Sequence, residues 1–293
     1  AAAALEEKLI TPTTSVVSTG GIYVGAWFFP DWKPGGHGVT DVRKAIAESV
    51  NTFFYTIGGG HEGIKGLGPE KIAAYARKFG FGSALGIDLP GEGAGFLPSK
   101  EWKKQTKNEP WYIGDTYHLA IGQGDILVTP LQIEMTAVFA NGGSLVRPHV
   151  VNGIMTADGK RIPREPEVLA AQVVSPATIQ VVREGMRRAV TAGSARSLGD
   201  LPIEVAAKTG TAQWRTGKAT HAWFTSFAPY DDPKLVVTVN IEEGGEGSHS
   251  AAPVAKDIYA WYFGGRKAAG TAVVGPDPSI SADANAPVGA AGE

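Results

Sequence analysis

The segment Ile203–Gln213 (IEVAAKTGTAQ) combines residue types that can bind and activate a charged substrate. A short apolar run leads into Lys208-Thr209-Gly210-Thr211, which predicts a strand that presents a cation, two hydroxyls and a flexible backbone. Side chains alternate along a strand, so Lys208 and Gly210 should face one side of the sheet and the two threonines the other. Gly210 lacks a Cβ, which would let a substrate backbone lie close to the strand edge.

A second candidate motif, Ser49-Val50-Asn51, lies at the predicted end of a helix. From average composition, K-T-G occurs by chance in roughly one chain in twenty of this length, and S-x-N in about one per chain. Arg215-Thr216-Gly217 has the same form as K-T-G, but only the Lys208 triplet follows a predicted strand. Asn51 by itself is also typical of a helix C-cap. The order and separation of the two motifs favour Ser49, Asn51 and Lys208 as catalytic candidates.

Helices and an antiparallel sheet are predicted around these motifs. Thr40 is the expected cap of a helix that runs to about Glu48, and Thr52–Ile57 predicts a further buried helix or strand. Four more helices are expected: from Pro69 to Gly80, from Thr129 to Asn141, from Ser175 onward, and over Ala251–Phe263. Strands are predicted at Leu145–Ile154, Ile203–Gln213, Ala222–Tyr230 and Leu235–Glu242, the last two as a hairpin, and Thr11–Pro30 is predicted to be rich in turns.

The bulk composition limits the class of protein. The chain has 293 residues, of which 43% are hydrophobic and 19% charged, so it can bury a large core. Its formal net charge of -2 argues against nucleic acid as a partner, because nucleic-acid binders usually carry a basic excess. Cysteine is absent, which excludes disulfides, thiolate nucleophiles and cysteine-based zinc sites. No apolar run approaches the ~18 residues that a membrane helix needs.

Seven segments of the chain carry a further signal through their identity and order. They are DWKPGGHG (Asp31–Gly38), ESVNTFFY (Glu48–Tyr55), YARKFGFG (Tyr75–Gly82), GIDLPGE (Gly86–Glu92), IGQGDILVTPLQ (Ile121–Gln132), KTGTAQ (Lys208–Gln213) and HAWFTSFAP (His221–Pro229). Together they resemble the C-terminal transpeptidase domain of class B penicillin-binding proteins, specifically the penicillin-binding protein 2 family of cell elongation. S-x-x-K, S-x-N and K-T-G are the motifs of penicillin-binding proteins and related β-lactamases. The resemblance covers residues 1–265 as a transpeptidase domain that lacks its beginning, and residues 266–293 are expected to be a disordered Ala/Gly/Pro-rich tail.

The third motif of the family is missing, because no Ser in this chain is followed three residues later by Lys. In the family that Ser is the nucleophile and that Lys its proton acceptor. We expect the chain to begin downstream of them, with Ala1–Leu9 as later turns of the same helix, and we expect this chain alone not to become acylated.

The resemblance implies a role for each motif residue that is present. Ser49 would relay a proton toward the leaving amine, Asn51 would bind the substrate amide, and Lys208 would keep the site positive. The hydroxyls of Thr209 and Thr211, beside the flexible Gly210, would hold the terminal carboxylate of the substrate. The N–H of Thr211 would be one donor to the oxyanion, and losing such a donor typically costs about 10²–10³ in rate.

The resemblance also raises the question of a metal. Some members of the family hold a structural zinc near S-x-N through two Asp, one His and one Cys. Asp31 and His37 match two of these ligands, but Val50 stands at the Cys position and Val16 at the upstream Asp. Two ligands do not close a tetrahedral zinc site. We therefore predict no metal and no cofactor, and a loop from Asp31 to His37 that is held by hydrogen bonds.

The predicted fold is α/β (α+β), of the penicillin-binding protein transpeptidase and serine β-lactamase type. It has an antiparallel sheet flanked by helices and a helical subdomain that carries Ser49 and Asn51. The resemblance implies D,D-transpeptidation of peptidoglycan stem peptides, inhibition by β-lactams, and a place on the outer face of the cytoplasmic membrane. The implied partners are a rod-elongation glycosyltransferase and associated membrane proteins.

Two alternatives remain open from the sequence. One is a β-lactamase or D,D-carboxypeptidase on the same fold. A β-lactamase needs a deacylating base, usually a Glu in a loop; the sequence has no such signature, and Glu92 and Glu134 are the two carboxylates left open for that role. The other is a non-catalytic scaffold or sensor that resembles penicillin-binding proteins but has lost its nucleophile.

Overall fold

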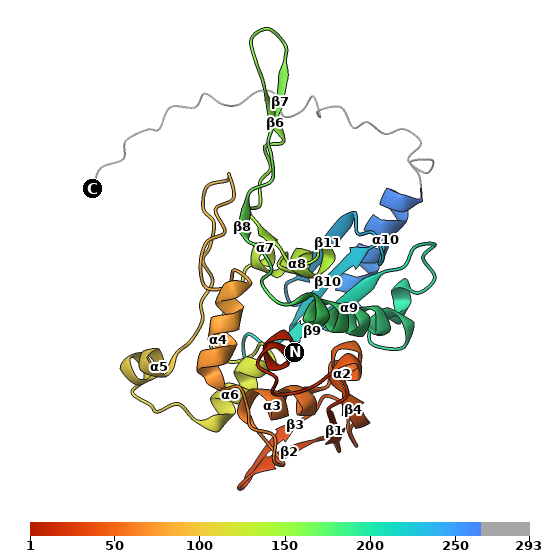
Figure 1. Cartoon of the computed structure of the whole chain (residues 1–293). Helices are drawn as coiled ribbons and strands as arrows, with labels where there is room; N and C mark the ends of the chain where they lie inside the picture. The colour runs from red at the N-terminus through yellow and green to blue at the C-terminus, as the bar shows by residue number, and fades with distance from the viewer. Residues whose placement is uncertain (265–293) are drawn as a thin grey trace, which may run out of the picture.

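The computed structural model describes residues 1–264, whose largest sheet is antiparallel and has three strands (Figure 1). The tail predicted at residues 266–293 lies outside the described residues. The sheet has the order β11-β10-β9, with β9 at Ala206–Ala212, β10 at His221–Ala228 and β11 at Leu235–Ile241. These strands confirm the three that were predicted late in the chain. Within the described part of the chain β9 pairs with β10 alone, so it is an edge strand.

The two faces of the sheet pack against different helices. Phe224 of β10 is buried in one cluster with the α10 residues Ala252 and Tyr259, so α10 (Ala251–Phe263) covers that face. The Ser226 hydroxyl and the Tyr259 hydroxyl lie 2.9 Å apart within this contact. Thr209 of β9 lies directly opposite Phe224, so its side chain is on the same face of the sheet. Side chains alternate between the two faces, so every second residue of β9 shares this face with Thr209.

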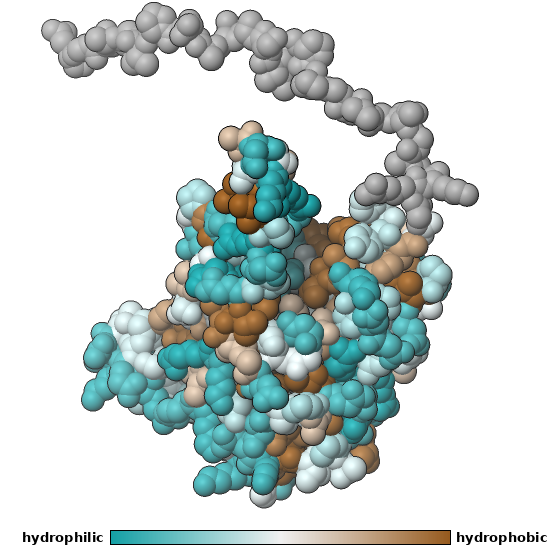
Figure 2. Space-filling view, turned by 45° about the horizontal axis from the view of Figure 1, so that its top comes forward, coloured by the Kyte–Doolittle hydropathy of each residue, from teal (hydrophilic) through white to brown (hydrophobic). Residues whose placement is uncertain are grey.

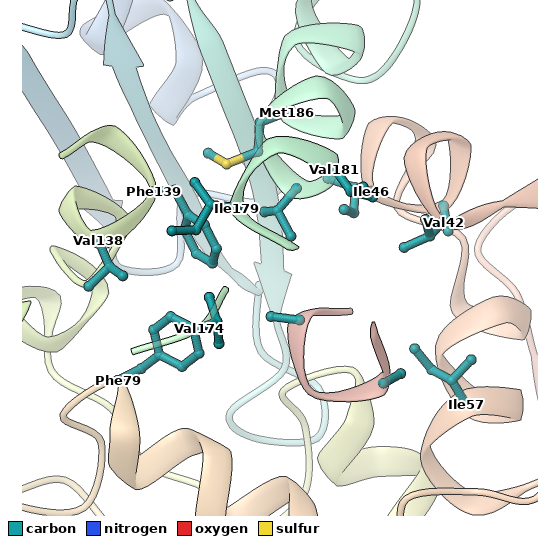
Figure 3. Close-up of a cluster of buried hydrophobic side chains, with 14 of the residues drawn as sticks. Val42, Ile46, Ile57, Phe79, Val138, Phe139, Val174, Ile179, Val181 and Met186 are labelled. Carbon is teal, nitrogen blue, oxygen red and sulfur yellow. The ribbon is translucent and has the colours of Figure 1, made fainter. Parts of the chain in front are cut away.

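The other face carries the main hydrophobic core. Figure 3 shows apolar side chains from several helices that point toward one shared volume. They come from α2 (Val42–Glu48), α3 (Asn51–Gly59), the end of α4 (Gly68–Lys78), α8 (Thr136–Ala140) and α9 (Pro176–Thr191). The short helix α1 (Ala2–Glu6) contributes Ala2 and Ala4, so the first residues of the chain belong to this core.

Helices α2 and α9 lie unusually close together. A Cβ on Gly185 of α9 would lie 2.9 Å from the Ile46 side chain of α2, so the absence of a side chain sets this spacing. The Ser175 hydroxyl caps α9 by accepting from the Thr178 N–H, and the Glu6 carboxylate of α1 accepts from the Ser175 N–H 3.1 Å away. The packing at Gly185 thus fixes α9 relative to α2, whose C-cap is Ser49, and the bond to Glu6 fixes α9 relative to α1.

The mainly helical part carries the S-x-N motif and lies at the lower side of Figure 1. It contains α2, α3 and α4 together with α5 (Lys100–Lys107) and α6 (Ile113–Ala120). Glycines at positions 58 and 59 face Ala120 and Tyr117, so α3 and α6 pack closely.

Besides the three-stranded sheet, the described residues form four two-stranded sheets. Two lie near the S-x-N motif: β1 (Ser15–Ser18) with β4 (Gly38–Asp41), and β2 (Gly21–Val24) with β3 (Trp27–Pro30). Two lie toward the top of Figure 1: β5 (Leu145–Val146) with β8 (Val168–Ala170), and β6 (Gly153–Met155) with β7 (Arg161–Pro163). The β6–β7 hairpin projects away from the rest of the protein.

Several local predictions are wrong. Asp41, not Thr40, caps α2 by accepting from the Lys44 N–H, whereas the Thr40 hydroxyl bonds to Gly38 inside β4. The predicted strand Leu145–Ile154 is divided between β5 and β6, which pair with different partners. The helix predicted from Thr129 has the expected capping box, but it breaks into α7 (Pro130–Ile133) and α8. Three short strands occupy the turn-rich stretch Thr11–Pro30.

The surface drawn in Figure 2 is mostly hydrophilic, with apolar patches between hydrophilic ones. Among residues 1–264, no helix has the length and hydrophobicity required to span a bilayer.

Candidate active site

Ser49 and Lys208 are 159 residues apart in the sequence and meet in the structure. Ser49 ends α2 as its C-cap, in a left-handed conformation with φ 56°. Lys208 comes from the edge strand β9, and its Nζ donates to Ser49 Oγ at 2.8 Å and to the Thr209 carbonyl at 2.5 Å. A cation is thus fixed beside a hydroxyl that can pass on a proton.

Burial changes the acidity of the Lys208 ammonium. Desolvation lowers the pKa of Lys208 from its ordinary value of 10.5 to about 8, because the charged form loses its hydration. Lys208 therefore stays mostly protonated near neutral pH but gives up its proton far more readily than a surface lysine. This places a proton donor of moderate strength next to Ser49.

Asn51 is the first residue of α3, and Val50 is the N-cap of that helix. The left-handed C-cap position belongs to Ser49, so the structure does not support the interpretation of Asn51 as a helix C-cap. Within residues 1–264 the Asn51 carboxamide forms no hydrogen bond, whereas its N–H donates to Asp31 at 3.3 Å. The backbone of Asn51 is held while its side chain remains available to a ligand.

The loop from Asp31 to His37 fixes both ends of the S-x-N motif. The buried Asp31 carboxylate accepts from the Asn51 and Thr52 N–H groups at the start of α3. It also accepts from the hydroxyls of Ser18 and Thr52. The indole N–H of Trp32 donates to the carbonyls of Glu48 and Ser49 at the end of α2, each at 3.1 Å.

The residues around this loop do not fit a four-ligand zinc site. His37 Nδ1 is bound to Glu48 at 2.8 Å, and its buried Nε2 has no hydrogen-bond partner among the described residues, with Asp31 3.6 Å away. The other two ligand positions hold Val16 and Val50, whose buried side chains belong to the hydrophobic core and cannot bind a metal. In residues 1–264, no three side chains of His, Asp or Glu converge in a way that could hold a metal ion.

The two threonines of β9 have different surroundings. Thr209 is buried and its hydroxyl lies 2.7 Å from the Ser194 hydroxyl, whereas Thr211 is exposed and its carbonyl accepts from Gln123 Nε2 at 3.3 Å. The missing Cβ of Gly210 would lie 3.0 Å from the Cβ of Trp223, so the close approach at this glycine is to β10. The predicted approach of a substrate to Gly210 remains a proposal.

Sequence analysis missed the contributions of Trp32, Gln123 and Ser194. Trp32 and Gln123 lie inside two of the matching segments, DWKPGGHG and IGQGDILVTPLQ, so their position was a signal. Ser194 follows α9 and has no motif, and only the fold brings it to Thr209.

The two carboxylates considered as deacylating bases have other contacts. Glu92 accepts from the N–H groups of Leu85, Gly86 and Ile87 and thereby closes its own loop. Burial raises the pKa of Glu134, which lies against Thr238 of β11. Among the described residues, neither carboxylate has a hydrogen bond to Ser49, Asn51 or Lys208.

Comparison with known families gives one match that covers most of the chain. Residues 1–260 match the model of the penicillin binding protein transpeptidase domain. The chain is 36% identical to the peptidoglycan D,D-transpeptidase MrdA of Haemophilus influenzae, over 91% of this chain. It spans only 43% of the length of that relative.

Solved structures show the same resemblance. Penicillin-binding protein 2 (PBP2) of Pseudomonas aeruginosa, in complex with WCK 5153, superimposes with a TM-score of 0.78 and 35% identity, covering 89% of this chain and 58% of that one. PBP2 of Helicobacter pylori in complex with MreC gives a TM-score of 0.76 and 34% identity, covering 90% of this chain and 48% of that one. The fold predicted from the sequence is confirmed.

Proposed function

This chain belongs to the penicillin binding protein transpeptidase family, and from that membership we propose that it is part of a peptidoglycan D,D-transpeptidase of cell-wall elongation. The observation that carries the proposal is the contact between Lys208 Nζ and Ser49 Oγ at 2.8 Å. It joins the two motifs of this chain across 159 residues.

The proposed reaction is acyl transfer through a serine acyl-enzyme. The nucleophilic Ser and its Lys are not among residues 1–293, which contain no S-x-x-K. The nucleophile attacks the carbonyl between the two terminal D-alanines of a stem peptide, and the acyl-enzyme forms as D-alanine leaves. The amine of a neighbouring stem peptide then attacks the acyl-enzyme and makes the cross-link.

The residues of this chain would bind the substrate and move protons. Ser49 passes a proton to the leaving amine, and the Lys208 ammonium next to it supplies positive charge. Asn51 binds the substrate amide through its carboxamide. The Thr209 and Thr211 hydroxyls, on either side of Gly210, hold the terminal carboxylate, and the Thr211 N–H donates to the oxyanion.

The proposed partners and location follow from relatives. A relative from Helicobacter pylori has been solved in complex with MreC, and another similar structure is that of a peptidoglycan synthase complex. We infer a comparable assembly for this protein, with a glycosyltransferase and membrane proteins of the elongation machinery. The transpeptidase domain would lie outside the cytoplasmic membrane, and β-lactams would bind as mimics of the acyl donor.

Intact mass after exposure to penicillin tests the proposal. Two proteins are compared: this chain, and a version that also carries the sequence encoded upstream of Ala1 in the parent gene. We expect only the longer protein to gain the mass of one penicillin, and we expect its adduct to be stable. Rapid turnover of the drug would instead indicate a β-lactamase, and stable acylation with release of D-alanine but no cross-linking would indicate a carboxypeptidase. If both proteins are folded and neither gains mass, the catalytic proposal fails and a non-catalytic scaffold is favoured.

A further inference from the structure

We propose that Ser194 is a positioning residue that directs the Thr209 hydroxyl toward the terminal carboxylate of the substrate. This inference rests on the proposed function and adds a residue to it. Ser194 lies outside the three motifs of the family, in the turn after α9.

The contact between the two hydroxyls is short and sheltered. Ser194 Oγ and Thr209 Oγ1 lie 2.7 Å apart, and Thr209 is 8% exposed. A pair of hydroxyls at this distance shares one proton along the line between the oxygens. The direction of that bond decides where the remaining proton points.

The backbone of Ser194 is anchored independently of its side chain. Its N–H donates to the Ala47 carbonyl of α2 at 3.0 Å. The preceding residue must be glycine for this approach, because a Cβ on Gly193 would lie 2.2 Å from the Ala47 oxygen. Ser194 therefore joins the helix that carries Ser49 to the strand that carries Thr209.

A hydroxyl has one proton and two lone pairs, so Thr209 can donate to only one acceptor. If Thr209 donates to a carboxylate, it can still accept from Ser194, and the two bonds then strengthen each other. A carboxylate has no proton to donate, so it can bind Thr209 only when Thr209 is its donor and Ser194 donates to Thr209. Ser194 as the donor thus leaves the Thr209 proton for the substrate.

The test separates carboxylate recognition from general structure. In the acylating protein of the parent gene, kcat/KM is measured for a donor peptide that ends in D-alanyl-D-alanine and for the same peptide with a C-terminal amide. We expect Ser194→Ala to lower kcat/KM roughly three- to tenfold for the carboxylate peptide, the usual effect of one hydrogen bond, and to leave the amide peptide unchanged. Ser194→Thr, which keeps the hydroxyl, should restore the preference.

Other outcomes overturn the inference. Equal losses for both peptides would indicate a merely structural role, and no change for either would show that Ser194 does not act on Thr209. If the unmodified protein reacts with neither peptide, the proposed function fails on its own. The two peptides are then compared by noncovalent binding to the 293-residue chain, where loss of the carboxylate preference in Ser194→Ala supports the inference and an unchanged preference overturns it.

Discussion

The indole nitrogen of Trp32 lies 3.1 Å from the main-chain oxygen of Ser49, and it also donates to the carbonyl of Glu48. Ser49 has φ 56°, a conformation that costs a residue with a Cβ roughly 1–2 kcal/mol. Trp32 therefore holds the catalytic candidate in a backbone geometry that it would not prefer alone. The side chain of Trp32 is largely exposed, so this hydrogen bond rather than burial is its main contribution.

Trp32→Phe keeps an aromatic ring but removes the N–H donor. We expect the free energy of unfolding to fall by about 0.5–1.5 kcal/mol, the usual value of one hydrogen bond, as measured by urea denaturation. In the acylating protein, the rate of penicillin acylation should fall as well, because Ser49 is held less firmly. Trp27→Phe is the matched control, since Trp27 is also exposed and lies in β3. Equal effects of the two substitutions would contradict this role of Trp32.

Asp31→Asn tests the cap at the start of α3. The Asp31 carboxylate accepts from three N–H groups and two hydroxyls, and an amide places donors where acceptors are needed. We expect the free energy of unfolding to fall by about 2–3 kcal/mol, because buried donors are left unsatisfied. Thermal or urea unfolding measures this change.

Asp41→Asn is the control for that substitution. Asp41 caps α2 through a single bond from the Lys44 N–H, and Asn is an equally good N-cap. We expect a change of a few tenths of a kcal/mol. If Asp31→Asn is as mild as Asp41→Asn, the carboxylate is not required to position Asn51.

The parts of the fold that follow from local signals could be predicted from the sequence. The hydroxyl cap of α9 and the bounds of α10 agree with the prediction because caps and helical periodicity act within a few residues. Strands β9, β10 and β11 are long enough for their apolar pattern to be clear. The four-residue strand β1 was missed, because its pairing partner β4 comes twenty residues later.

In the candidate site, too, some residues could be predicted from the sequence and others depend on contacts between distant parts of the chain. Ser49, Asn51 and Lys208 could be proposed from motif order, since their residue types and spacing are unusual together. Ser194 could not be assigned a role, because an isolated Ser carries no signal until the chain brings it to β9, and the only signal for Gln123 was its position inside a matching segment. The choice between Asp41 and Thr40 as helix cap depends on the pairing of β4 with β1, in which Thr40 lies opposite Val16, and this pairing is a tertiary contact.

The pH dependence of stability should report the burial of Lys208. Below pH 8 Lys208 is charged in both the folded and the unfolded protein, and above about pH 10.5 it is neutral in both. Between these values the unfolded state holds a proton that the folded state has released, so the contribution of Lys208 to the free energy of unfolding rises with pH. Burial of the charge is therefore most unfavourable below pH 8.

Lys208→Met removes this titration. The free energy of unfolding is measured with urea at several pH values. Between pH 8 and 10.5, the value for the unmodified protein should rise relative to the value for Lys208→Met. Lys65→Met, at an exposed position, should run parallel to the unmodified protein. A constant difference between the unmodified protein and Lys208→Met would mean that the pKa of Lys208 is not lowered.

The Gln123 side chain donates to a main-chain carbonyl of β9 that an extended substrate would need as its own hydrogen-bond acceptor. The backbone of Gln123 is fixed after α6 by bonds from the N–H groups of Gln123 and Gly122 to His118 and Leu119, and Gly122 has φ 73°. Only the side chain reaches β9, where it donates to the Thr211 carbonyl at 3.3 Å. That carbonyl and the Thr209 carbonyl both accept side chains, so both point away from β10, toward the free edge of β9.

A peptide that pairs with the edge of β9 would donate its own amide to the Thr211 carbonyl. We therefore expect Gln123→Met, which removes the competing donor, to lower the dissociation constant of an acetylated D-alanyl-D-alanine peptide about two- to fivefold. Gln123→Glu should raise that constant, because its carboxylate would face the carboxylate of the peptide. Both variants should keep the free energy of unfolding within about 0.5 kcal/mol, since the side chain lies at the surface. An NMR titration of the 293-residue chain measures the binding. Shifts of both variants in the same direction, or no shift in either, would show that Gln123 does not compete for this edge.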